Sequence, residues 1–191
     1  SSDLIFRPLS ALPADAPAYW LAAHGIASIA AHTNLDKAPG GVNDLLAAQL
    51  ALRDIHPAAD GICRIGTLPL PLSSLMFARY AARQLRLPAG GLRWLDGGGQ
   101  VRTVAVCGGA GGEYLPGFSA SRIADAYLTG ELHYHEWDAA APGGGLTVAE
   151  AGHFDTEIGI AAELARCIAA AFPALAVRPA DERCAFEPLT D

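Results

Sequence analysis

Short apolar runs alternate along this chain with stretches of helical periodicity, and this alternation restricts its fold more than any other feature. Residues 101–112, 125–130 and 146–152 read as strands, each running into a glycine-rich or polar loop. Residues 131–140 have the pattern of a short helix, and residues 155–172 have that of the longest helix. Such an order predicts an α/β protein with a mainly parallel or mixed sheet.

The first part of the chain repeats this rhythm less regularly. The run GIASIAA at 25–31 predicts a buried strand that leads into the polar string HTNLD, and residues 62–71 predict an edge strand closed by prolines. Two amphipathic helices are predicted here as well, with alternative caps: Asn43 or Asp44 for the first, and Ser73 or Ser74 for the second.

The length and composition allow a substantial core. The chain has 191 residues, of which 51% are hydrophobic, so no disulfide or metal is needed to hold a fold together. The turn-rich segment 87–100 separates two predicted α/β halves, residues 1–98 and 99–191.

Charge and cysteine content exclude several classes of protein. A net charge of -7 argues against general binding to nucleic acid or to anionic membranes, because their phosphates require a basic face. The four cysteines lack CxxC spacing and predict reduced, mostly buried thiols. The sequence shows no signal-peptide pattern and no run of roughly 18 apolar residues. We therefore expect a soluble, cytoplasmic protein.

Polar clusters follow the predicted strands. The strings HTNLD, GGAGG, TGELHYH and GHFDTE each lie just beyond the carboxyl end of one strand. Open α/β sheets bind ligands at this edge. The four clusters therefore predict one shared site.

His153 and Glu157 are the first candidate pair in that site. Their i, i+4 spacing places both side chains on one helix face, close enough to hold the same ion. The alternative is a capping histidine followed by a first-turn glutamate that complements the helix dipole.

The string HTNLD offers further candidates. Asp36 would supply a carboxylate to a cation, while His32 and Asn34 would line the cavity or contact a substrate. The alternative is an ordinary turn, since Asn, Asp, Pro and Gly are common loop residues.

The string TGELHYH contributes Thr129 as a cavity-lining residue and Glu131 and His135 as possible general acid or base. On a helix His133 and His135 diverge by about 200°, so they are not expected to bind one ion together. Glu131 and His135, at i and i+4, are the better pair. A purely structural role for this segment, with Glu131 at a helix start, is the alternative.

Five strings in order resemble a known family. LIFRPL, AAHTNLDKAPGGVNDLLA, VAVCGGAGG, DAYLTGELHYHEWDA and EAGHFDTE are similar to those of the NGG-one-interacting factor three family, also described as dinuclear metal-centre hexameric proteins and as GTP cyclohydrolase I type II homologues. The resemblance extends from Leu4 to about Phe186. It implies two interlocked α/β halves, in the short family form without an inserted domain, and assembly into a homohexameric ring.

The resemblance also implies ligands for a metal. These are Asp36, His153 and Glu157, which would hold one or two divalent ions of Zn, Mn or Fe per chain. Family members carry an additional N-terminal segment that ends in a metal-binding His-His pair directly before the string matched by LIFRPL. The sequence here has Ser1, Ser2 and Asp3 at that place, and serine is a poor ligand for such ions. With this set we expect at most one tightly held ion.

The resulting functional hypothesis is metal-dependent hydrolysis of a nucleotide or another small molecule. Cations for a substrate phosphate, such as Lys37 and Arg122, are few. The alternative hypothesis is a metal-binding or scaffold protein that catalyses nothing and acts through its oligomeric ring.

Overall fold

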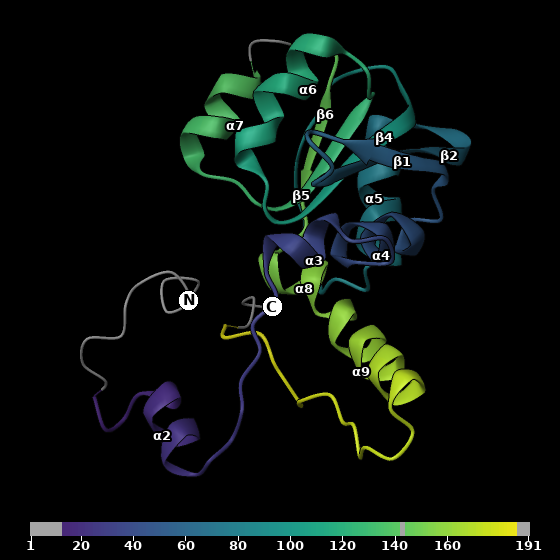
Figure 1. Cartoon of the computed structure of the whole chain (residues 1–191). Coiled ribbons are helices and arrows are strands. Elements are labelled where there is room, and N and C mark those ends of the chain that lie inside the picture. Colours follow the sequence, from purple (N-terminus) through teal and green to yellow (C-terminus); the bar gives the residue numbers. More distant parts are fainter. Residues whose placement is uncertain (1–12, 142–143, 187–191) are drawn as a thin grey trace. The chain divides into compact units, whose positions relative to one another are not determined.

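The computed structural model describes residues 13–141 and 144–186, and they form a mixed α/β structure (Figure 1). The chain divides into two compact units, Ser1–Leu35 and Asp36–Asp191. Ser1, Ser2 and Asp3, at the place of the expected His-His pair, lie outside the described residues. The predicted α/β class is confirmed.

The described part of the first unit contains helix α2, Pro17–Ala23, and the start of α3, Thr33–Lys37, which continues into the second unit. The second unit contains the strands β1 Arg53–Ala58, β2 Cys63–Ser73, β3 Arg93–Leu95, β4 Gln100–Ala110, β5 Ala126–Glu131 and β6 Thr147–Glu150. Its helices are α4 Val42–Gln49, α5 Ser74–Gln84, the 3-10 helix η1 Gly112–Tyr114, α6 Leu115–Ser121, α7 Tyr134–Ala140, α8 His153–Glu157 and α9 Gly159–Ala171.

The six strands form one mixed sheet in the order β1-β2-β4-β5-β6-β3. The central strands β4, β5 and β6 are parallel to one another. Antiparallel pairs flank them, with β1 and β2 on one side and β3 on the other. Because β3 pairs with β6, the segments 1–98 and 99–191 contribute to the same sheet.

Each face of the sheet is covered by its own helices. Helices α4 and α5 pack on one face through Leu46, Phe77 and neighbouring buried residues. Helices α6 and α7 cover the other face (Figure 1), where Phe118 stacks on Tyr127 with 5.0 Å between ring centroids. This layered burial is why the central strands read as continuous apolar runs.

Local sequence explains where several helices begin. Ser73 caps α5, since its hydroxyl accepts from the Met76 N–H, and this confirms one of the two predicted caps. The cap of α4 differs from the prediction, because Gly41 occupies that position. Asp44 instead accepts a hydrogen bond from the Gly40 N–H at 2.7 Å, and Asn43 is buried.

Three expected elements differ from the structure. Residues 25–31 form no strand and are exposed, and residues 13–35, the described part of their unit, contain no strand with which this apolar run could pair. Strand β2 lies inside the sheet, since β1, which the sequence did not suggest, pairs with its outer side. The long helix predicted over 155–172 is divided at Ile158 into α8 and α9.

Two of the four cysteines match the expected burial. Cys63 and Cys107 are buried free thiols, while Cys167 is exposed and Cys184 is half-buried. A hydrogen bond with Cys107, together with burial, raises the pKa of the Cys63 thiol far above its usual range. None of the helices within the described residues combines the length and apolar character needed to cross a bilayer.

Candidate functional site

The carboxyl ends of the three parallel strands meet at one edge of the sheet. Strands β4, β5 and β6 end at Ala110, Glu131 and Glu150. Their parallel registers bring three of the predicted polar clusters to this edge. The shared location inferred from the sequence is therefore found for the glycine loop, the TGELHYH segment and the GHFDTE segment.

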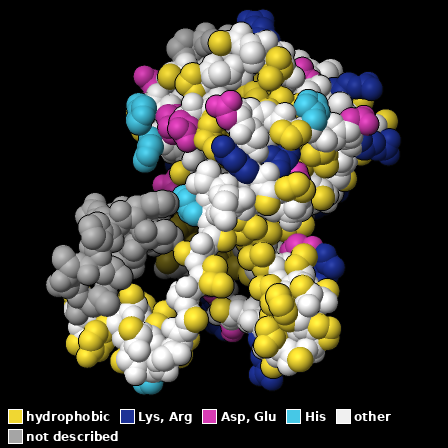
Figure 2. All heavy atoms as spheres, viewed as in Figure 1, with side chains coloured by type: hydrophobic (Ala, Val, Ile, Leu, Met, Phe, Trp, Pro, Cys, Tyr) yellow, Lys and Arg dark blue, Asp and Glu magenta, His cyan; other side chains and the backbone are white. Residues whose placement is uncertain are grey.

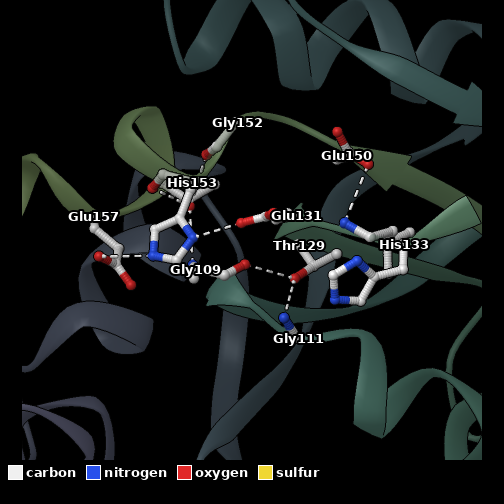
Figure 3. A network of polar contacts seen from close by, with 12 residues as sticks. Gly109, Gly111, Thr129, Glu131, His133, Glu150, Gly152, His153 and Glu157 are labelled. Atoms are coloured by element: carbon white, nitrogen blue, oxygen red, sulfur yellow. Dashed lines mark hydrogen bonds and ion pairs between the residues drawn. The ribbon is translucent and has the colours of Figure 1, made fainter. Parts of the chain in front are cut away.

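His153 lies between two glutamates at this edge (Figure 3). Its Nδ1 is 3.0 Å from Oε2 of Glu131, and its Nε2 is 3.5 Å from Oε2 of Glu157. Glu157 follows His153 by one turn of α8, as the spacing predicted, whereas Glu131 comes from the end of β5. All three side chains are about half exposed, so the imidazole is accessible from solvent.

Glycines form the floor beneath these side chains. Gly109 has a left-handed φ of 67°, and a Cβ placed there would lie 2.3 Å from Oε1 of Glu157 and 3.2 Å from Nε2 of His153. A Cβ at Gly130 would lie 2.9 Å from the His153 Cα. The backbone of two strands thus approaches the histidine and glutamate more closely than any residue with a side chain would allow.

Two buried threonines fix the glycine loop. The Thr129 hydroxyl donates to the Gly109 carbonyl at 3.2 Å and accepts from the Gly111 N–H at 3.1 Å (Figure 3). The Thr156 hydroxyl accepts from the Gly109 N–H at 3.1 Å. Thr129 is fully buried and its hydroxyl is engaged with backbone groups. Its role here is to hold the loop.

Two further residues at this edge were not identified from the sequence. Buried Asn43 accepts from the Gly108 N–H at 2.7 Å and donates to the Ile62 carbonyl, which ties α4 to the glycine loop. Buried Glu150 pairs with Arg93 and accepts from the Leu132 N–H at 3.1 Å. A signal existed for Glu150, because a carboxylate at a fully buried strand position requires partners.

The first cluster, HTNLD, lies partly in the other compact unit. Asn34 accepts from the backbone N–H of His32 at 2.8 Å, and the His32 ring contacts the Thr33 hydroxyl at 3.0 Å. Both contacts are local and lie at the start of helix α3. Asp36 is half-buried in α3, at the start of the second unit.

His135 has a different neighbour from the one expected. Glu131 ends a strand, so the two residues do not share a helix, and the predicted i, i+4 pair is wrong. His135 instead stacks on His133 with 5.6 Å between ring centroids, which also corrects the expected divergence of the two rings. His133 precedes the helix as its cap residue, and this extended backbone removes the helical rotation between the rings. His135 lines a separate cavity of about 530 Å³ between α6 and α7.

The donor chemistry of His153 and Glu157 suits a divalent cation. When Nδ1 of His153 donates to Glu131, the Nε2 lone pair faces the Glu157 carboxylate, and a cation or a proton is needed between two such acceptors. Imidazole and carboxylate are ligands of zinc, manganese and iron. Within residues 13–141 and 144–186, no group of three or more His, Cys, Asp or Glu side chains is arranged to hold a metal ion. His153 and Glu157 therefore form a pair of metal-capable side chains and not a complete ligand set.

Comparison with known sequences connects this site to a family. Residues 3–182 match the model of the Duf34/NIF3 (NGG1p interacting factor 3) family. A Lactococcus lactis protein named GTP cyclohydrolase 1 type 2 homolog is 34% identical over 142 residues, which cover 69% of this chain and 54% of that protein. A Streptomyces coelicolor protein of the same name is 36% identical over 142 residues, which cover 69% of this chain and 50% of that protein. The chain spans about half the length of these relatives.

A solved structure has the same fold. The Bacillus cereus protein related to NIF3 superimposes with a TM-score of 0.78 at 20% sequence identity, and the match covers 97% of this chain and 81% of the other. The family model extends over most of the 191 residues and includes the glycine loop, Glu131, His153 and Glu157. The chain therefore belongs to the Duf34/NIF3 (NGG1p interacting factor 3) family.

Proposed function

We propose that this chain binds a divalent transition metal at the carboxyl edge of its sheet and acts as a metal-dependent hydrolase on a nucleotide or another small molecule. The observation that carries the proposal is the position of His153, held between Glu131 and Glu157 above a glycine with no side chain. The names of the curated relatives support a nucleotide as the substrate class.

The residues of the site divide into ligands and a positioning residue. Nε2 of His153 and the carboxylate of Glu157 would bind the ion, with Asp36 as the third ligand that the family resemblance implies. Glu131 would accept from Nδ1 of His153, fix the tautomer and leave Nε2 free. Loss of a residue that hydrogen-bonds a metal-binding histidine typically lowers metal affinity by about 10 to 100-fold.

A divalent ion at this position would supply Lewis acidity, which polarises a substrate oxygen or activates water. The half-exposed imidazole leaves a substrate direct access from solvent. Glu131 ends β5 at the same edge of the sheet, and its half-exposed carboxylate would exchange a proton with water there. His135 faces the cavity between α6 and α7 and would act only on a substrate that extends to it.

Elemental analysis of the purified protein tests the metal site. We expect about one equivalent of zinc, manganese or iron per chain, lost in His153→Ala and in Asp36→Ala. Glu131→Gln should retain metal with weaker affinity. His56→Ala is the matched control, because His56 is an exposed histidine on the edge strand β1. Equal metal content in the wild type and His153→Ala would refute the site.

Activity is tested separately. Nucleoside triphosphates are incubated with metal-loaded protein, and products are separated by chromatography. Turnover that disappears in His153→Ala and with a chelator supports the hydrolase. Bound metal without turnover of any nucleotide or generic phosphoester would favour the non-catalytic metal-binding alternative.

We also propose that the chain works as an oligomer, with a homohexamer as the assembly that the family resemblance implies. Helix α9 contains no buried residue, and Ile168 and Phe172 at its C-terminal end are 41% and 59% exposed. Figure 2 shows hydrophobic side chains over much of this helix. A second copy would remove this surface from water. Light scattering after size exclusion measures the mass, and a monomer at micromolar concentration would contradict the proposal.

A further inference from the structure

Helix α5 presents a row of arginines on its exposed side. Arg79 and Arg83 are spaced i and i+4, so they lie on the same side of the helix, and Arg86 follows two residues after its end. From Arg79 to Arg83 the helix rises about 6 Å. Together the three guanidinium groups offer enough N–H donors for more than one phosphate or carboxylate.

These arginines line a cavity of about 600 Å³ between α5, the segment 87–92 and β3. Its other walls are mainly apolar, and the half-buried Trp94 provides an aromatic surface. The full lining is Leu75, Ala78, Arg79, Ala82, Arg83, Arg86, Leu87, Pro88, Ala89, Gly90, Leu92 and Trp94. A ligand with one anionic part and one flat apolar part matches this combination.

No acidic side chain lines the cavity. Arg64, Arg93 and Arg166 form ion pairs with Asp44, Glu150 and Glu163. By contrast, within the described parts of the chain, no carboxylate pairs with any of the three cavity arginines. In a chain of net charge -7, three arginines that line one cavity without a carboxylate partner are a local concentration of positive charge, which attracts anions.

The backbone at Arg86 adds an independent observation. Arg86 follows the end of α5 with a left-handed φ of 56°, a conformation that glycine adopts at such helix ends without cost. Arginine there costs of the order of 1 kcal/mol. Backbone strain of this kind often accompanies a functional side chain. Arg86 lines the same cavity as Arg79 and Arg83.

We propose that this cavity binds a phosphorylated small molecule that carries an aromatic ring. The phosphates would bind the forked guanidinium groups of Arg79, Arg83 and Arg86, and the ring would lie against Trp94 and Leu92. The cavity contains none of the residues of the His153 site. This inference therefore does not depend on the proposed metal-dependent activity.

Isothermal titration calorimetry with three probes tests the ligand class. ADP carries phosphates and a ring, pyrophosphate carries only the anion, and adenosine carries only the ring. We expect ADP to bind most tightly, pyrophosphate more weakly and adenosine not measurably. Because the proposed substrate of the metal site is also a nucleotide, the arginine variants below, which leave His153 intact, decide where ADP binds. Absence of ADP and pyrophosphate binding at millimolar concentration would overturn the proposal.

Variants then locate the binding. Arg83→Gln should lower the affinity for ADP about 10-fold or more, because hydrogen bonds from a charged group to the phosphates are lost. Arg86→Gly should lower the affinity for ADP. The melting temperature should stay the same or rise, because glycine adopts the left-handed backbone conformation without strain. The control is Arg102→Gln, an exposed arginine on β4 outside the cavity. Equal affinities in Arg83→Gln, Arg86→Gly and this control would refute the assignment. Dissociation of an oligomer by Arg83→Gln, with ADP binding unchanged, would do the same.

Discussion

Gly109 determines how closely the backbone approaches the candidate metal ligands. Two features of Gly109 contribute: its left-handed φ and the absence of a Cβ beside Glu157. Alanine substitutions at Gly109 and at a control glycine distinguish their effects. We expect Gly109→Ala to cost about 1 kcal/mol through the backbone. The fold should survive, because Oε1 of Glu157 is the end of a flexible side chain. The new methyl group should displace Glu157 from His153 and lower bound metal in elemental analysis.

A second glycine serves as the control for this prediction. Gly99 has a φ of 80°, but a Cβ there would contact nothing within 4 Å. Gly99→Ala should therefore lower the free energy of unfolding, measured in urea, by a similar amount and leave the metal content unchanged. Equal metal content in both variants would show that the close approach at Gly109 has no functional role.

Asp96 gives stability that depends on pH. The Gly98 N–H donates to its carboxylate at 2.8 Å, and this bond, with a smaller contribution from Ser74, lowers the pKa of Asp96 below its usual 3.8. A lowered pKa in the folded state gives stability that is present above the ordinary pKa and is lost as the pH falls below it. Asp96→Ala should therefore melt at a lower temperature than the wild type at pH 7. The two should converge near pH 3 or below. A constant difference across this range would contradict the prediction.

Arg64 joins α4 to β2 at the scale of secondary-structure elements. Its side chain is 4% exposed, pairs with Asp44 and donates to the Gly61 carbonyl at 2.7 Å and the Lys37 carbonyl at 3.1 Å. Removing one partner of a buried pair leaves the other charge uncompensated. We therefore expect Arg64→Ala to lower the free energy of unfolding by about 3 to 5 kcal/mol.

The exposed pair in α9 is the comparison for Arg64. Arg166 lies three residues after Glu163 on the surface, where its hydrogen bonds lower the pKa of Glu163 to about 2. Arg166→Ala should leave the free energy of unfolding in urea almost unchanged, because water screens such exposed ion pairs. Similar losses in both arginine variants would mean that burial does not determine the strength of these contacts.

The elements differ in how clearly their sequences announce them. Strands β4, β5 and β6 were predictable because buried parallel strands have continuous apolar sequences that end in glycine or polar residues. Strand β1 was not, since RDIHPA contains a proline and has no alternation. The run at 25–31 has strand-like composition, but strand formation also requires a neighbour, which local sequence does not reveal.

The same distinction applies to the site. The contact between His153 and Glu157 followed from helical spacing within α8. The contact between His153 and Glu131 depends on how β5 and β6 are paired, so local sequence could not predict it for two residues 22 positions apart. The Asn43 bond to the glycine loop is likewise a tertiary contact across 65 residues.

At the scale of the whole molecule, the core belongs to one unit. Every buried hydrophobic side chain among the described residues lies between Val42 and Ala151, inside the unit Asp36–Asp191. Deleting residues 1–35 should therefore leave a protein that unfolds cooperatively, with far-ultraviolet circular dichroism typical of an α/β fold. Loss of a cooperative thermal transition would show that the unit Ser1–Leu35 is required for folding.

The position of β3 has a consequence for the order of folding. This strand precedes β4 in the chain but pairs with β6, and Arg93 and its partner Glu150 are 57 residues apart. Closing so long a loop is entropically costly, whereas β1 and β2 are joined by a short turn. The three-residue β3 is thus the strand expected to join the sheet last and to exchange its amide hydrogens first. The edge of the sheet formed by β3 would then be its most dynamic part. Local opening that leaves the core folded would be enough to expose the amides of β3 to exchange.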